Sequence, residues 1–303
     1  MIGRSFPVFS AGRKVIVHAD ERLAQWWPLI APHIPGTTVA LPPALDPMAS
    51  PVACDADLTG LRTSGDARRV INAHLHRVHL EHRAVCVHGV TLADPDSTAA
   101  VVLLGGHGAG KTLVAMALAG RGWLPMAGDV TILGASPPGA PLDHIAGVAD
   151  AAVAVLGGTR AFAVRAAAVR RWFPAIEIRR PVEDLSGQWP APEPGDVPVT
   201  GAVMVHVDGD PQLSAEPDGL DAHTAASAWW HASGHLLDRW SDDAPPMWRL
   251  IEDAGHLHDR AVLVRALATR VRLTRLRGDP HGIAAAIDST HRATCRTALT
   301  VLP

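Results

Sequence analysis

Residues 105–112, Gly-Gly-His-Gly-Ala-Gly-Lys-Thr, have the types and the spacing of a phosphate-binding P-loop. A glycine-rich loop lets successive backbone N–H groups turn toward a phosphate chain without a Cβ in the way. Lys111 then supplies a positive charge to the outer phosphates, and the Thr112 hydroxyl offers an oxygen ligand to Mg²⁺. The predicted nucleotide-binding residues are Gly105, Gly106, His107, Gly108, Ala109, Gly110, Lys111 and Thr112.

The sequence on either side of this loop supports the prediction. Residues 99–104 form an apolar run typical of a buried strand, and residues 113–119 are typical of a helix that ends at Gly120 or Gly122. A helix N-terminus after a strand and a glycine loop favours phosphate, because unpaired N–H groups and the helix dipole both point there. The alternative is a glycine-rich turn that binds nothing.

Two further residues, His88 and Asp129, are expected to lie near this loop. Residues 83–92 alternate as a strand does, and His88 lies within them; a turn at residues 94–96 would return the chain to the strand before the loop. Asp129 lies at the start of a short strand after the expected helix. An alcohol must lose its proton as it attacks a phosphoryl group, so a base is needed near the outer phosphate. A buried core histidine and a turn aspartate are the structural alternatives.

Together these pieces resemble the HPr serine kinase/phosphorylase family over roughly residues 70 to 135. The resemblance rests on His88-Gly89, the loop at 105–112, Arg121-Gly122-Trp123 and Gly128-Asp129. It implies an α/β fold with a P-loop core of the HPr kinase/PEP carboxykinase-like type, and it implies ATP and Mg²⁺. By the same resemblance His88 and Asp129 handle the proton of a serine hydroxyl with Lys111 at the phosphates, and Thr112 and Asp129 are the metal ligands.

The chain also departs from that family's pattern. Glycine stands at position 128, where the family has the first acid of an acidic pair, and Leu113 stands where a glutamate commonly follows the loop. Fewer acids around Mg²⁺ favour the forward kinase reaction over the reverse phosphorylase reaction. The family's C-terminal regulatory signature has no convincing counterpart, so a carbon-regulation HPr kinase is not expected.

The remaining patterns predict two units. Residues 1–50 read as a small N-terminal α+β module, with a hairpin over 6–18, a helix over 21–30 and a proline-rich linker over 35–51. Residues 51–303 form the predicted kinase domain, with a strand over 201–207, a helix over 222–240, and a closing strand and helix after residue 271. A proline-rich stretch over 181–197 is expected to be a loop or lid edge, and Arg160 and Arg165 are candidates to neutralise phosphoryl charge.

Histidines and tryptophans at helical spacing invite other interpretations. Residues 66–82 are predicted to be a helix, and its histidines 74, 76, 79 and 82 could suggest a metal site. No carboxylate or cysteine completes a ligand set at matching spacing, so a solvated helix face is preferred. Trp26 and Trp27 are expected in a core or interface and not in a base-stacking platform. The tryptophans of 222–240 are expected in a core, with substrate docking as the alternative.

Composition excludes several classes of protein. The net charge is −3 with both signs interspersed, so no basic field predicts binding to nucleic acid or to an anionic membrane. No apolar run reaches the ~18 residues of a membrane span. Three cysteines lie far apart and form neither a disulfide framework nor a zinc motif. The N-terminal residues lack a secretion signal, and we expect a cytoplasmic protein.

Three functions agree with these observations. The first is an ATP-dependent kinase acting on a Ser/Thr hydroxyl of a peptide or small protein, including the precursor of a ribosomally made natural product. The second is a small-molecule kinase for a free amino acid or another alcohol, and the third is a nucleotide-binding module without catalysis, which the glycine at position 128 would suit. A homo-oligomer is compatible with any of them.

Overall fold

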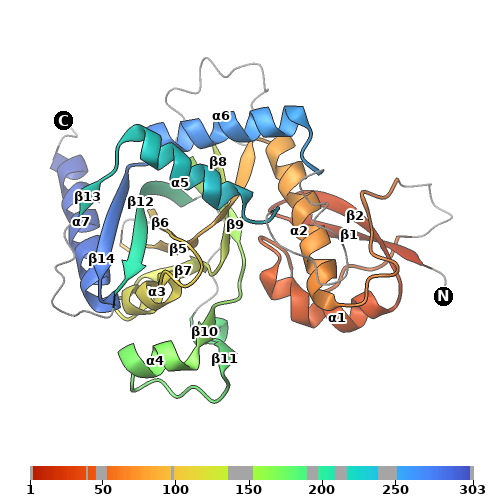
Figure 1. Ribbon diagram of the computed structural model, residues 1–303, viewed down its shortest axis with the longest axis horizontal. Helices are drawn as coiled ribbons and strands as arrows, with labels where there is room; N and C mark the ends of the chain where they lie inside the picture. Colours follow the sequence, from red (N-terminus) through yellow and green to blue (C-terminus); the bar gives the residue numbers. More distant parts are fainter. Residues whose placement is uncertain are drawn as a thin grey trace.

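The computed structural model shows an α/β protein with mixed sheets (Figure 1). It describes residues 3–38, 40–45, 53–96, 99–135, 153–189, 197–208, 217–237 and 251–300, with side chains to residue 293. Parts of the predicted proline-rich segments (46–51 and 190–196) lie outside the described residues, and so does Trp240. In the described part of the chain, no helix is long and apolar enough to cross a membrane.

The N-terminal part begins with the predicted hairpin, because alternating apolar residues flank the turn at Ala11 and Gly12. Strands β1 (Arg4–Ser10) and β2 (Arg13–Ala19) pair antiparallel, and β3 (Ala56–Asp57) joins β2 in parallel. The predicted helix follows as α1 (Arg22–Ile30), and a single 3-10 turn (Ala31–His33) ends it. Trp27 is 2% exposed and belongs to the core of this part, as expected.

A long helix connects the N-terminal sheet to the rest of the molecule. Helix α2 (Ser64–Glu81) begins at Thr63, whose side chain accepts a hydrogen bond from the Asp66 backbone N–H. Its Ile71 and Leu75 belong to the same hydrophobic cluster as Val15 and Trp27. The N-terminal hydrophobic core therefore continues beyond residue 50, where the sequence placed the module boundary.

The main sheet is built from strands of both directions. Its order is β4-β8-β9-β12-β6-β5-β7, and β14 and β13 extend it beside β12. The bounds of its strands are β4 Ala84–His88, β5 Val90–Ala93, β6 Ala100–Leu104, β7 Leu124–Ala127, β8 Val130–Ala135, β9 Val153–Gly158, β12 Val197–Val207, β13 Asp218–Gly219 and β14 Leu273–Gly278. The predicted strands at 99–104, 201–207 and 271–280 are confirmed. The single strand predicted over 83–92 is divided at Gly89: β4, which carries His88, pairs with β8, and only β5 pairs with β6 beside the loop.

Strand β12 belongs to two different ladders. At its start, Val197 and Pro198 pair antiparallel with β9. Farther along, the strand pairs in parallel with β6 on one side and with β14 on the other. The carboxyl ends of β6, β12 and β14 therefore meet at one edge, which is where loops after parallel strands gather into ligand sites.

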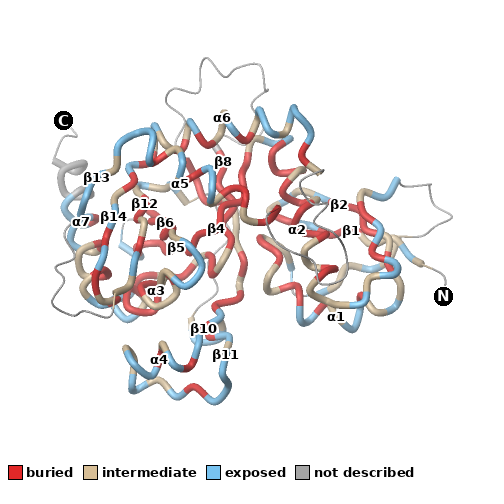
Figure 2. Tube along the Cα trace, in the orientation of Figure 1, coloured by how far each residue is buried: buried red, intermediate tan, exposed pale blue. Residues whose placement is uncertain are grey.

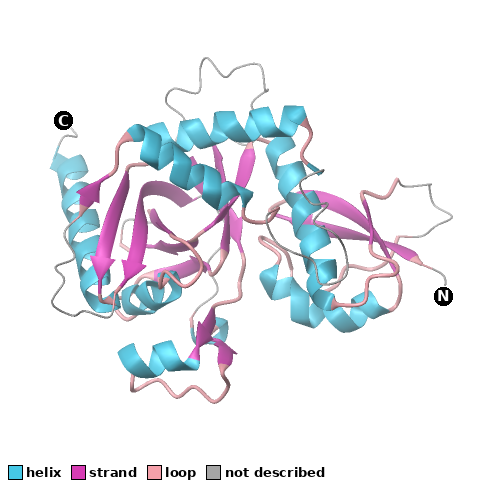
Figure 3. Ribbon diagram, viewed as in Figure 1, coloured by secondary structure: helices cyan, strands magenta, loops and turns pink. Residues whose placement is uncertain are grey.

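Helices cover both faces of this sheet (Figures 1 and 3). Alternate residues of β6 point to opposite faces: Val102 packs in a cluster with α5 (Ala222–Gly234) and α6 (Ala254–Arg270). Leu103 packs in another cluster, with α3 (Lys111–Ala119) and α7 (Pro280–Thr300). Figure 2 shows the resulting band of buried chain through the centre of the molecule. The predicted helices at 113–119 and after residue 281 are confirmed, and the helix expected over 222–240 ends at residue 234.

A small lobe projects from the sheet beside α3 (Figure 3). It consists of β10 (Ala163–Arg165), α4 (Ala166–Trp172), β11 (Val182–Asp184) and a 3-10 turn (Ser186–Gln188). Val164 and Val169 pack against Met116 of α3, so the lobe shares a hydrophobic cluster with the helix that follows the glycine loop.

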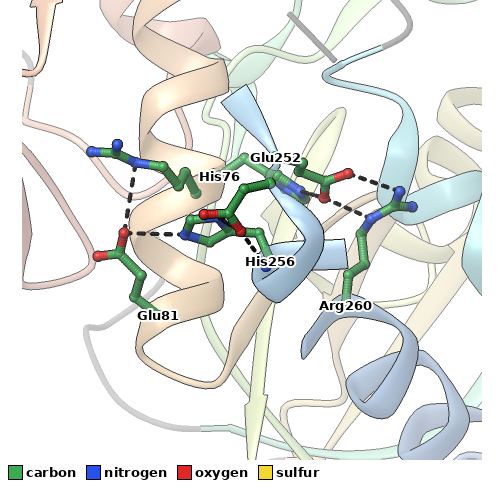
Figure 4. A network of polar contacts seen from close by, with 7 residues as sticks. His76, Glu81, Glu252, His256 and Arg260 are labelled. Atoms are coloured by element: carbon green, nitrogen blue, oxygen red, sulfur yellow. Dashed lines mark hydrogen bonds and ion pairs between the residues drawn. The ribbon is translucent and has the colours of Figure 1, made fainter. Parts of the chain in front are cut away.

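Two of the four histidines predicted on a solvated face, His76 and His79, are buried instead, whereas His82 is exposed. His76 and His79 are 0% and 1% exposed, because α2 is covered on one side by the N-terminal sheet and on another by α6. The ring of His79 contacts the Ser10 hydroxyl at 2.8 Å, and His76 Nε2 lies 3.0 Å from Glu252 Oε1 (Figure 4). No group of three possible metal ligands occurs among the described residues.

Candidate active site

The glycine loop, residues 105–112, connects the end of β6 to the start of α3. Three of its glycines have positive φ: Gly105 at 146°, Gly108 at 81° and Gly110 at 93°. A Cβ at Gly110 would lie 2.2 Å from Val207 Cγ2, and a Cβ at Gly105 would lie 2.9 Å from the Val205 carbonyl oxygen. Backbone conformation and close approach to β12 thus both require glycine at these two positions.

Helix α3 begins directly in the loop. Gly110 caps it without a side-chain hydrogen bond, so its first N–H groups face the loop, as an anion site requires. Lys111 is 7% exposed, and its Nζ donates to the carbonyl oxygens of Gly105 and Gly106 at 2.8 and 3.2 Å. The lysine is thus folded back over the loop. Thr112, the second residue of α3, is half-buried.

His88 and Asp129 lie side by side at the end of two neighbouring strands. Strands β4 and β8 are antiparallel, and their register pairs His88 with Val130, which places Asp129 next to the imidazole. His88 Nε2 is 3.2 Å from Asp129 Oδ1. The histidine side chain is 9% exposed and the carboxylate 41%, so the pair joins a buried ring to an oxygen that reaches solvent.

A buried threonine holds the backbone at Asp129. The Thr159 hydroxyl accepts hydrogen bonds from the backbone N–H groups of Asp129 and Val130 at 2.9 and 3.0 Å. The Gly128 N–H donates to the Thr159 carbonyl at 2.9 Å. A Cβ at Gly128 would lie only 2.0 Å from the Ala161 carbonyl oxygen. The backbone at position 128 therefore requires glycine, and the carboxylate lies on the next residue, Asp129.

Close backbone contact also places His88 beside the loop. Gly89, the residue between β4 and β5, lies where a Cβ would be 3.0 Å from Val102 and 3.2 Å from the Leu103 carbonyl oxygen of β6. The Thr131 hydroxyl donates to the Gly89 carbonyl at 2.9 Å. Glycine at position 89 thus lets the backbone pass close to β6, so that β5 can pair with the strand that leads into the glycine loop.

A large cavity opens where the loop and His88 meet. Its volume is about 920 Å³, and its lining includes His88 together with Gly105, Gly106, His107 and Ala109 of the loop. The structure therefore brings His88 and the loop to one space. Lys111 and Thr112 do not line it, and Asp129 lines a smaller neighbouring cavity of about 20 Å³ with Arg68 and Asn72 of α2.

The far wall of the large cavity was not predicted. It contains His206 of β12, His231 of α5, His235 directly after α5, and Arg275 and Arg277 of β14. Arg277 donates to Asp208 at 2.8 Å, and Arg275 is paired with Asp218. These residues carry no motif, and only the topology that places β14 and α5 beside β12 brings them to the loop.

The two arginines singled out in the sequence lie in different surroundings. Arg165, at the end of β10, donates from Nη2 to His107 Nε2 at 3.1 Å, so the small lobe contacts the glycine loop. Arg160 is half-buried and its burial lowers the pKa of the guanidinium, while its backbone N–H donates to Pro32 in the N-terminal part. Of the two, Arg165 is the one placed at the loop.

Comparison with known proteins gives little beyond this geometry. No protein-family model and no curated protein matches the sequence. Among solved structures, the chain is similar to the Hpr(Ser) kinase/phosphatase from Coxiella burnetii at 10% sequence identity and a TM-score of 0.29; the match covers 71% of this chain and 94% of that one. A likeness of this size carries no argument about activity, which must rest on the site itself.

Proposed function

We propose that this protein is an ATP-dependent kinase with an HPr-kinase-like P-loop core, which transfers a phosphoryl group to a Ser or Thr hydroxyl of a peptide or small protein. The observation that carries the proposal is the His88–Asp129 pair, whose imidazole lines the same cavity as Gly105 and Gly106. Phosphorylation of an alcohol requires an acid–base group next to the loop that binds the phosphates.

Different residues contribute to different steps of the proposed phosphoryl transfer. Backbone N–H groups of the loop and the N-terminus of α3 bind the phosphates, and Lys111 turns from the loop carbonyls to the phosphate oxygens. The acceptor oxygen attacks the γ-phosphorus as the bond to the bridging oxygen of ADP breaks. The hydroxyl proton passes to the His88–Asp129 pair, and the Thr159 hydroxyl keeps the backbone of Asp129 in place.

We propose that Mg²⁺ would bind here together with a nucleotide. No group of three or more potential ligands is found among the described residues, whereas Mg²⁺ commonly takes one or two protein oxygens together with phosphate oxygens and water. Thr112 and Asp129 are the oxygens we propose for it. Bound there, the cation neutralises the charge that develops on the outer phosphates.

Mass spectrometry tests the proposal directly. The protein is incubated with ATP, Mg²⁺ and a panel of Ser- and Thr-containing peptides, natural-product precursors included, beside free serine and threonine, and products are searched for the mass of one added phosphate. Phosphorylated peptide is the expected product. Phosphorylation of the free amino acids alone would replace the peptide kinase by a small-molecule kinase, and tight ATP binding without ADP formation would leave a binding module.

Asp129→Asn is the variant that tests the mechanism. We expect kcat to fall by roughly 10²–10⁴-fold, the usual contribution of a positioned base, while the affinity for ATP without Mg²⁺ is retained, because the glycine loop is unchanged. Glu177→Gln is the matched control, because that carboxylate is 75% exposed and pairs with the exposed Arg179. Normal turnover by Asp129→Asn would remove the base from the mechanism.

A further inference from the structure

A second histidine lies flat against His88. The ring centroids of His88 and His235 are 3.7 Å apart and the ring planes differ by 11°, so the two imidazoles are stacked face to face. His235 is the residue at which α5 ends, and both rings line the large cavity. His88 is thus contacted at its edge by Asp129 and on its face by His235.

The end of α5 is fixed by the two residues that follow His235. Leu236 packs with Cys86, Val130 and Ile132, which belong to the strands that carry His88 and Asp129. Leu237 packs instead into the N-terminal hydrophobic cluster. Both leucines are buried, at 6% and 3% exposed. The position of His235 is thereby set by the same strands that set its partner.

The contacts leave the His88 ring little freedom. Rotation about its Cβ–Cγ bond tilts the ring plane, which would turn Nε2 away from Asp129 and break the parallel stack with His235. A flat neighbour on the ring face therefore holds the ring in the plane in which Nε2 meets the carboxylate, while the contact of Nε2 with Asp129 selects between the two orientations related by a half turn.

We propose that His235 is a positioning residue, which holds the His88 imidazole edge-on to Asp129 by stacking on its face. The inference rests on the proposed kinase function, because the ring it orients is the one assigned to proton transfer. The flat ring carries this role, so an aromatic side chain without nitrogen performs it as well. Small displacements of a catalytic group reduce turnover by up to about 10²-fold.

Three variants test the proposal in the full-length protein. We expect His235→Ala to lower kcat by about 10- to 100-fold while the KM for ATP stays within about twofold. His235→Phe restores a flat ring and should keep kcat within about threefold of the wild type. His223→Ala, an exposed histidine at the other end of α5, serves as the control and should behave as the wild type.

A spectroscopic measurement separates this proposal from the proposed function. Stacking shifts the His88 ring protons upfield in NMR spectra, and the shift should disappear in His235→Ala but persist in His235→Phe. An unchanged His88 resonance or an unchanged kcat in His235→Ala would overturn the positioning role, as would equal damage by Ala and Phe. Wild-type protein without transfer to any acceptor would overturn the kinase, while the NMR comparison still decides whether His235 orients His88.

Discussion

At the scale of single residues, Gly128 shows how packing limits the chemistry of the site. The backbone passes so close to Ala161 that no side chain fits at position 128, and Asp129 is the residue whose carboxylate meets His88. Placing an acid at position 128 would therefore first require the backbone to move.

Gly128→Ala is therefore expected to destabilise the protein. The added Cβ would meet a carbonyl oxygen at 2.0 Å, and backbone cannot yield as a side chain does. We expect the free energy of unfolding to fall by about 1–3 kcal/mol or more, measured by urea denaturation. Gly187→Ala is the control, because a Cβ there has no atom within 4 Å. Equal stability of the two variants would contradict the close approach.

At the scale of elements, α2 connects the N-terminal sheet to α6 through buried polar contacts. His79 faces Ser10 of β1, while His76 faces Glu252, which also accepts two hydrogen bonds from Arg260 at 2.7 and 2.9 Å (Figure 4). Burial lowers the pKa of His76, and the hydrogen bonds from His76 and Arg260 hold the pKa of Glu252 below its usual value despite its burial. These contacts make α2 sensitive to acid.

His79 gives the sharpest expectation for pH. Burial lowers its pKa to about 3, whereas in the unfolded chain it is near 6.5. The folded state holds the neutral ring, so its contribution to stability is complete above pH 6.5 and is lost as the pH falls toward 3. Between pH 6.5 and 5, unfolding free energy should drop by about 2 kcal/mol from this group alone.

In the His79→Gln variant, the unfolding free energy should fall less steeply as the pH is lowered. The amide can still bond the Ser10 hydroxyl but takes up no proton in this range. The measurement is the urea-unfolding free energy of both proteins at a series of pH values from 7 to 5. His258→Gln, an exposed histidine of α6, should leave the wild-type slope intact. Parallel curves for wild type and His79→Gln would refute a neutral buried ring.

Glu252 tests the other contact of α2. Its side chain is 3% exposed and that of Arg260 is 7% exposed, so Glu252→Gln leaves a buried guanidinium without its counter-charge. Losing one member of a buried ion pair typically costs about 3–5 kcal/mol. Glu177→Gln, which breaks a pair exposed by about three quarters, should cost under about 1 kcal/mol. Thermal unfolding of the two variants gives the comparison.

At the scale of the whole molecule, local sequence patterns predicted the helices, strands and loops better than the contacts between them. Alternation around Gly12 predicted the N-terminal hairpin, and glycine spacing predicted the loop, since both depend on neighbouring residues. The proximity of His88 and Asp129 was expected only through the resemblance, and it arises from the β4–β8 register. The burial of His76 and the stacking of His235 were missed, because their partners lie far away in the sequence.

Strand β12 pairs with β9 at one end and with β6 farther along, and this arrangement has a consequence for heat inactivation. One end of this strand is bonded to the β4-β8-β9 ladder, beside which lies the pair we propose for proton transfer, and the other end to β6, which leads into the glycine loop. The two halves of the site cannot separate unless these backbone bonds break. Phosphoryl transfer and the fluorescence of the buried Trp123 and Trp229 should therefore fail at one temperature, and transfer lost several degrees earlier would show that the halves come apart first.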